Sequence, residues 1–303
     1  MSKHFPRIRI PWEHGGGLAV REGLSACFYM LRSHQEVGSA VLRALETYKR
    51  AVGPRALVWY SGGDEEDWLE LDEPGWASTR GALLDSRFAS LELRDELEGA
   101  GQFRFSYLGR WLDDPRSAVS SGQACAACFW LSSEYMEAHG PAHIHTLILA
   151  LARELPFDSG HAGLCFHAEE GLGVLRAIQP LCLRYPGLDI PDMAMASLDI
   201  GTRVRGVHWL NFFGPQLLRT LGGVESLRSR LSAPGTAVER LGEERAMVTL
   251  GEWPEAGDTE QGHTLPAYRE LARVLEPWLY RRDTPFHSFT EEDTRRWERR
   301  FLD

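Results

Sequence analysis

Residues 23–31, GLSACFYML, form an apolar run with the length of one β-strand. Residues 37–52 follow with apolar side chains at helical spacing, and the glycine–proline pair after Val52 ends that pattern. A second apolar run, ALVWY, occupies residues 56–60. Strand, helix and strand in this order predict a β-α-β unit, because a helix is the usual connection between two parallel strands.

The same order of elements returns in the second half of the chain. The Ala-Cys-Phe of residues 127–129 stands 101 residues after the Ala-Cys-Phe of residues 26–28, and both lie in apolar runs. A helical pattern then begins near Pro141, and the short apolar run AGLCF follows at residues 162–166. We therefore predict that the two halves repeat one β-α-β arrangement and that these units superpose.

Further elements complete the predicted fold. Residues 207–213 (VHWLNFF) and 246–250 (AMVTL) have the character of strands, and residues 265–280 that of a helix. We predict an α+β fold with mixed sheets covered by helices, in which two pseudo-repeated β-α-β halves form one compact body. The predicted domains are an N-terminal β-α-β lobe, residues 1–116, and a C-terminal lobe with β-α-β units and C-terminal helices, residues 117–303.

Charge and hydropathy limit the classes of partner. The 303 residues contain 33 Lys and Arg against 43 Asp and Glu, a formal net charge of −10. This balance argues against direct nucleic-acid binding, which calls for a basic face. No run approaches the roughly 20 apolar residues of a membrane helix, and the charged start of the chain does not resemble a signal peptide. We expect a cytoplasmic protein without a membrane partner.

The five cysteines do not suggest a site. An odd number in a long chain favours reduced thiols over a disulfide framework. Cys125 and Cys128 have the spacing of a redox pair or of half a zinc site, but Cys128 lies in an apolar strand and no second CxxC exists. We predict buried thiols that act as small apolar side chains.

Histidines offer the one alternative with catalytic chemistry. His139, His143 and His161, together with Asp158, could form a metal-dependent or acid–base site if they converge in space. The HExxH, GxSxG and GK[ST] motifs, which place ligands, a nucleophile or phosphate-binding groups in a defined geometry, do not occur. The expected protein therefore has no catalytic residues, no cofactor and no metal ligands, and an enzyme that uses this histidine set remains the alternative.

Long runs in the C-terminal two-thirds resemble the bacterial type VI immunity family. The resemblance covers most of residues 125–303 and implies an antidote to a secreted toxin, notably one with a VRR-type nuclease domain. It implies a protein that is no enzyme and that neutralises its toxin by binding and occluding the active site. The runs that carry it are ELPFDSGHAGLCFH (154–167), RYPGLDIPD (184–192), GTRVRGVHWLNFFG (201–214), GEWPEAGD (251–258), LPAYRELARVLEPWLY (265–280) and WERRFLD (297–303).

An acidic segment is the most distinctive candidate for the contact with such a toxin. Residues 64–73, DEEDWLELDE, contain seven acids and no base. A nuclease cleft attracts phosphate, so carboxylates can compete for it, and the apolar side chains between them can anchor the contact. The predicted partner-binding residues are Asp64, Glu65, Glu66, Asp67, Trp68 and Leu71. An ordinary solvated loop or strand edge is the alternative interpretation of this segment.

Overall fold

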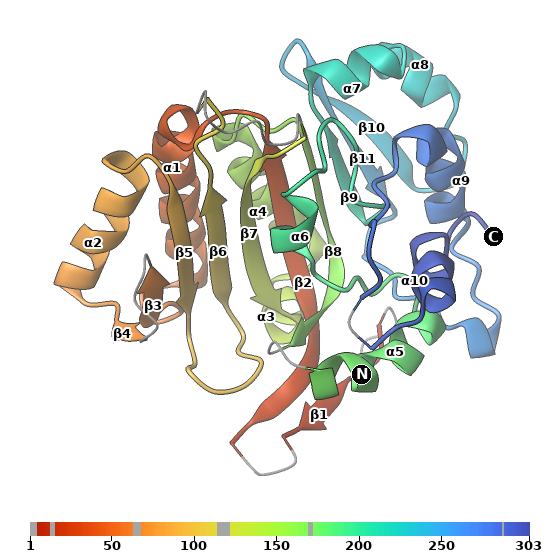
Figure 1. Ribbon diagram of the computed structural model, residues 1–303. Helices are drawn as coiled ribbons and strands as arrows, with labels where there is room; N and C mark the ends of the chain where they lie inside the picture. Colours follow the sequence, from red (N-terminus) through yellow and green to blue (C-terminus); the bar gives the residue numbers. More distant parts are fainter. Residues whose placement is uncertain (1–4, 13–15, 63–67, 114–121, 169–171, 287) are drawn as a thin grey trace.

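The computed structural model describes residues 5–12, 16–62, 68–113, 122–168, 172–286 and 288–303. Within these residues eleven strands form one sheet (Figure 1). The strands are β1 (Arg9–Pro11), β2 (Leu18–Met30), β3 (Trp59–Gly62), β4 (Leu69–Glu70), β5 (Ala89–Arg94), β6 (Arg104–Gly109), β7 (Cys125–Ser132), β8 (Ser159–Ala168), β9 (Leu210–Phe213), β10 (Thr236–Leu241) and β11 (Arg245–Leu250). The α-helices are α1 (His34–Val52), α2 (Glu73–Leu84), α3 (Ser133–His139), α4 (Pro141–Glu154), α5 (Leu172–Arg184), α6 (Met193–Ala196), α7 (Pro215–Thr220), α8 (Gly223–Ser229), α9 (Pro266–Leu275) and α10 (Glu291–Glu298).

The predicted α+β class is confirmed, but the expected mixed sheets are a single antiparallel sheet. Its strand order is β10-β11-β9-β8-β2-β7-β6-β5-β3-β4, with β1 paired to β2. The central strand β2 pairs with β7 on one side and with β8 on the other, antiparallel to both. The two strands of each predicted β-α-β unit are therefore not neighbours, because other strands lie between them.

The two predicted β-α-β units differ in strand order. Three strands separate β2 from β3, whereas only β2 separates β7 from β8. An equivalent repeat of the two halves is therefore contradicted at the level of topology, although both connections contain a helix. The strand β2 belongs to the predicted N-terminal lobe, residues 1–116, and it pairs on both sides with strands of residues 117–303. The domain boundary itself stays a prediction.

One face of the sheet packs against α1, α2 and α4. Strand alternation sends Phe28, Phe129 and Leu164 to this face, where they join the main hydrophobic core. The helix α1 presents Val41 and Leu45 to the same core, and both are fully buried. The other apolar positions of α1 recur at the spacing of an amphipathic helix, so the sequence pattern and the observed packing agree.

The opposite face of the sheet is covered over only part of its width. The helices α7, α8 and α9 pack on β9 and β11, and α6 lies against β7. Over β5 and β6, no helix of the described chain packs on this face, which is turned toward the viewer in Figure 1. The side chains of β3, β5 and β6 on this face are therefore left without a helical cover.

Candidate functional site

The helix-free part of the sheet carries a row of aromatic and cationic side chains. Strand pairing sets Trp59 opposite Arg94, Arg94 opposite Arg104, and Arg104 opposite Trp130. The alternating residues Leu91, Leu93 and Phe105 are in the main core and hold these strands against the helices. We call this surface the open face and define it as Trp59, Trp68, Glu92, Arg94 and Arg104, together with Trp130, which is 8% exposed.

The two arginines of the open face are held in place by an acid and two indole rings. Both bind the carboxylate of Glu92: Arg94 pairs with Oε1, and Nη2 of Arg104 donates to Oε2 at 2.6 Å. The Arg94 guanidinium lies 4.0 Å from the centre of the Trp68 ring, and that of Arg104 lies 5.3 Å from the centre of the Trp130 ring. Because these contacts already order the side chains, a partner that binds them would spend little free energy on immobilising them.

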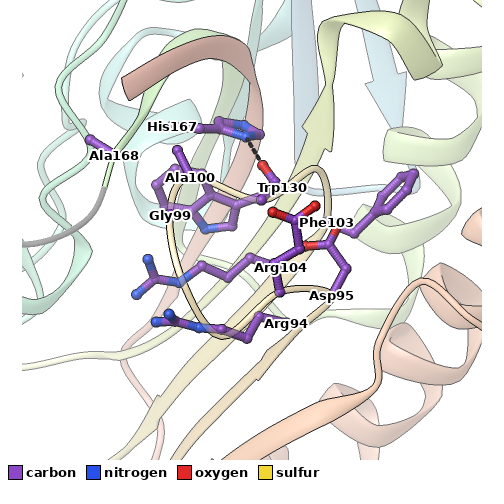
Figure 2. A pocket seen from close by; sticks show the side chains of 11 residues that line it. Arg94, Asp95, Gly99, Ala100, Phe103, Arg104, Trp130, His167 and Ala168 are labelled. Carbon is purple, nitrogen blue, oxygen red and sulfur yellow. Dashed lines mark hydrogen bonds between the residues drawn. The ribbon is translucent and has the colours of Figure 1, made fainter. Parts of the chain in front are cut away.

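A small pocket adjoins the open face beside the loop between β5 and β6. Figure 2 shows the two arginine side chains side by side, with Trp130 and His167 on the far wall. The ring of His167 lies edge-on to Trp130, with 4.8 Å between the ring centres, and its Nδ1 is 3.4 Å from the Gly101 carbonyl oxygen. Complete burial lowers the pKa of His167 to about 4, so the ring is neutral at pH 7.

Glycine at position 23 makes this arrangement possible. A Cβ atom on Gly23 would lie 2.3 Å from Nε2 of His167, so only glycine leaves room for the imidazole above β2. Asp95, another residue of the pocket wall, accepts a hydrogen bond from the Gln102 backbone N–H at 2.9 Å, which closes the loop between β5 and β6. The site is thus built on strands and a braced loop, and its residue types suit the core of a protein–protein interface, where Trp and Arg dominate binding energy.

Of the described residues of the predicted acidic segment, Trp68 contacts an arginine of the open face and Glu70 pairs with Trp59. Asp64, Glu65, Glu66 and Asp67 lie outside the described residues. Trp68 is half-buried over Arg94. Leu71 is 7% exposed and belongs to the main core. Of the remaining acids in the segment, Asp72 caps α2 by accepting a hydrogen bond from the Gly75 N–H.

The histidines predicted as an alternative catalytic site do not converge. His139 and His143 stack on each other at the junction of α3 and α4, with 4.7 Å between ring centres, and Nε2 of His143 is 3.1 Å from the Tyr135 hydroxyl. Asp158 accepts a hydrogen bond from the backbone of Leu31 at the start of β8. His161 points to the other face of the sheet. The predicted group of four residues was wrong, because α4 separates the two histidines near its start from Asp158 and His161, which follow its end.

His161 instead belongs to a buried group that the sequence did not reveal. Its ring stacks on that of His208, with ring centres 4.0 Å apart and planes 20° apart, and Nε2 of His208 lies 3.3 Å from Oδ2 of Asp189. Among the described residues, His161, Asp189 and His208 are the one group whose ligand atoms lie close enough for a metal ion. The strand β8 supplies His161, and the loops before α6 and before β9 supply Asp189 and His208, so no sequence spacing could have predicted the group.

The geometry of this buried group does not fit a metal ion. Zinc binds imidazole nitrogen at about 2.0–2.1 Å and in the plane of the ring. Two rings stacked about 4 Å apart hold their lone pairs in nearly parallel planes, so one ion cannot lie in both. Arg205 and Arg300 already supply positive charge to Asp189, and together with His208 they hold the pKa of its carboxyl far below the usual range. The charge of Asp189 is thus balanced by buried arginines, and the group is part of the protein core.

All five cysteines are free and buried, as the sequence predicted. Cys125 and Cys128 are three residues apart on β7, so their side chains point to opposite faces of the sheet and belong to different core clusters. Burial raises the pKa of both thiols. A disulfide or a shared metal between them is excluded by the strand geometry.

The open face holds Trp and Arg side chains whose positions are fixed by contacts within the chain. A family model described as TsiV, type VI immunity for VRR-NUC, matches residues 40–301. The chain therefore belongs to this family of type VI immunity proteins. It is also similar in structure to the Pseudomonas aeruginosa T6SS protein PA0821, with a TM-score of 0.80 and 19% sequence identity over 97% of this chain and 87% of that one. No curated protein matches the sequence.

Proposed function

We propose that this immunity protein acts without catalysis, by binding a VRR-NUC toxin directly and covering the surface on which the nuclease holds its substrate. The open face carries the proposal, because it presents ordered Trp and Arg side chains on a rigid sheet without a helical cover. A stable complex of this kind needs roughly 800 Å² of contact on each partner. The surface of four adjacent strands, from β3 to β7, offers a platform of the required kind.

Charge supports this proposal. The chain carries a net charge of −10, whereas a nuclease that holds a phosphate backbone needs positive charge in its cleft. The acids of residues 64–67 follow β3 in the sequence and immediately precede Trp68, which lies on the open face. We place Asp64, Glu65, Glu66 and Asp67 at the cleft of the toxin and Trp68 as an anchor, with Leu71 supporting the segment from the core.

We further propose that the protein acts in the cytoplasm, where the nucleic acid that it protects is found. Among the described residues, no helix combines the length and the apolar character needed to cross a bilayer. Co-expression with the VRR-NUC toxin in the cytoplasm of a test strain measures this directly. Survival with this protein, and death when it is exported to the periplasm by an added signal peptide, is the expected result.

The role of the acidic segment is tested by charge reversal. The triple variant Glu65→Lys, Glu66→Lys and Asp67→Lys should slow association with the toxin most strongly at low salt, because these charges would steer the encounter. A control with three exposed acids reversed elsewhere, Glu225→Lys, Glu291→Lys and Glu292→Lys, changes the net charge equally and should retain most of the rate. Equal association rates for the two triple variants at low salt would remove the segment from the interface.

A further inference from the structure

A second concave surface lies at the end of the sheet where β2 ends and β8 begins. It is a groove of about 890 Å³, open to solvent, with walls from the chain after β2, the end of α4, the start of α7 and the turn between β10 and β11. Phe157 and Leu241 give it an apolar floor, and three arginines project around it. We call this surface the Arg groove and define it by Arg32, Arg153 and Arg245.

Arg245 is fixed in a single orientation at the base of the Arg groove. Its Nη1 donates a hydrogen bond of 2.8 Å to the carbonyl oxygen of Leu155, and its guanidinium lies 4.8 Å from the centre of the Phe157 ring. The side chain is half-buried. Burial and the nearby charge of Arg32 both lower the pKa of Arg245. Arg32 and Arg245 thus both line the groove, close enough for their charges to interact.

Arg245 has no acid partner in the described chain, and Arg32 has one acid in its vicinity, Asp158. Among the described residues, no carboxylate oxygen forms an ion pair with Arg32, Arg153 or Arg245 within 4.0 Å. Asp158 also lines the groove; it accepts a backbone hydrogen bond of 2.7 Å from Leu31, and the charge of Arg32 acts on its carboxylate, so Arg245 is the arginine of the pair without a carboxylate. An ordered, half-buried guanidinium that lacks an anion has donors left for a planar oxyanion, which it can bind through two parallel hydrogen bonds.

The rim of the Arg groove indicates which anion fits. Glu154, Glu243 and Glu244 line the same groove, and Glu154 and Glu244 form ion pairs with arginines outside it. A nucleic acid would bring successive phosphates close to these three carboxylates and would be repelled. A single carboxylate on an otherwise neutral or apolar segment need not approach the glutamates of the rim. The residues beside it can contact Phe157 and Leu241.

We propose that the Arg groove binds an acidic side chain of the toxin, with its carboxylate held between Arg32 and Arg245. This inference rests on the proposed function, since it takes the toxin to be the partner, and it adds a contact separate from the open face. The contact has opposite charge to the one proposed for the acidic segment. The two together would therefore fix the orientation of the toxin, because a partner turned around would place like charges against each other.

The test uses the full-length protein and the purified VRR-NUC toxin from the same genome in biolayer interferometry. The double variant Arg32→Gln/Arg245→Gln should raise the dissociation constant roughly ten- to a hundredfold, the effect of losing charge-assisted hydrogen bonds. Arg245→Lys keeps the charge without the planar fork and should weaken binding by a smaller factor. The control is Arg296→Gln, at an exposed position on α10. It removes one positive charge, as each single substitution in the groove does, and should leave the dissociation constant within about twofold.

Three results would separate the inference from the proposed function. If the unaltered protein does not bind the toxin, the proposed function fails. If it binds, and the double variant binds within twofold while circular dichroism shows it folded, the Arg groove is not a toxin contact. If the double variant does not fold, the dissociation constant of Arg32→Gln is measured instead, because a substitution at this exposed position should not disturb folding. Binding of a fluorescent DNA duplex that the double variant loses, with toxin binding unchanged, would also overturn the inference.

Discussion

Two regions on the same face of the sheet each hold a carboxylate between cationic side chains, but one region is buried and the other is partly exposed. Where β8 and β9 are covered by later segments of the chain, Asp189 is 3% exposed and lies between Arg300, at 3.4 Å, and His208, at 3.3 Å. On the open face, Glu92 likewise lies between two arginines but keeps 23% of its side chain exposed. The buried ion group can only stabilise the fold. The partly exposed ion group also has atoms that a binding partner can contact.

The largest expected effect is on the covered ion group. Asp189→Ala would leave Arg205 and Arg300 buried without their carboxylate, and such a loss typically costs about 3–5 kcal/mol of unfolding free energy. Glu92→Ala on the open face should cost less, because its carboxylate keeps 23% of its surface exposed and its two arginines keep 11% and 20%. Urea denaturation followed by circular dichroism measures both. Similar losses for the two variants would show that the open face is as structural as the covered region.

Acid should destabilise the protein through its buried histidines. Burial lowers the pKa of His161, His208 and His167, the last to about 4. The unfolded chain takes up protons near pH 6.5, so stability is fully present above that pH and falls as the pH drops toward 4. His167 alone contributes a slope of about 1.4 kcal/mol per pH unit in this window. The check is the urea midpoint between pH 7 and 4.5, and an unchanged slope in His167→Gln would contradict the assignment.

A smaller effect is expected on toxin binding when the open face is altered. Trp68→Ala and Arg104→Ala should each weaken binding about tenfold, mainly through faster dissociation, because they remove ordered anchors from the contact. The matched control is Arg203→Ala, another arginine that lies 5.0 Å from an aromatic ring, that of Tyr280, but outside the open face. If the control weakens binding as much as the two test variants, the open face is not the main interface.

Much of the fold could be predicted from local pattern. The apolar run around residues 127–129 lies within β7, that at 162–166 within β8 and the predicted strand at 246–250 within β11. The short strand expected at residues 56–60 is displaced, because Ala56 and Leu57 are buried in the core before β3 begins at Trp59. The pairing of strands could not be read from the pattern, because a helical connection sets two strands parallel without deciding how many others lie between them.

Most contacts of the open face could not be predicted from the sequence. Trp68 was selected for its acidic neighbours, yet its observed contact is Arg94, which is 26 positions away. Arg104 and Trp130 become neighbours only through the register of β6 and β7. Trp130 lies in a continuous apolar run and Arg104 at the start of a short strand, so nothing local distinguishes an arginine that meets an indole from one that meets water. Strand order had to be known first.

The position of β2 has a consequence for the time at which protection begins. This strand is among the first to leave the ribosome, but its two neighbours, β7 and β8, end at residues 132 and 168. At about 5–20 residues per second, roughly 7–28 seconds of synthesis separate the end of β2 from the end of β8. Until β7 is made, both long edges of β2 beyond its pairing with β1 are open to wrong partners, including other nascent chains, and the edge that pairs with β8 stays open until residue 168. A newly made antidote is therefore of no use to the cell until more than half of it exists.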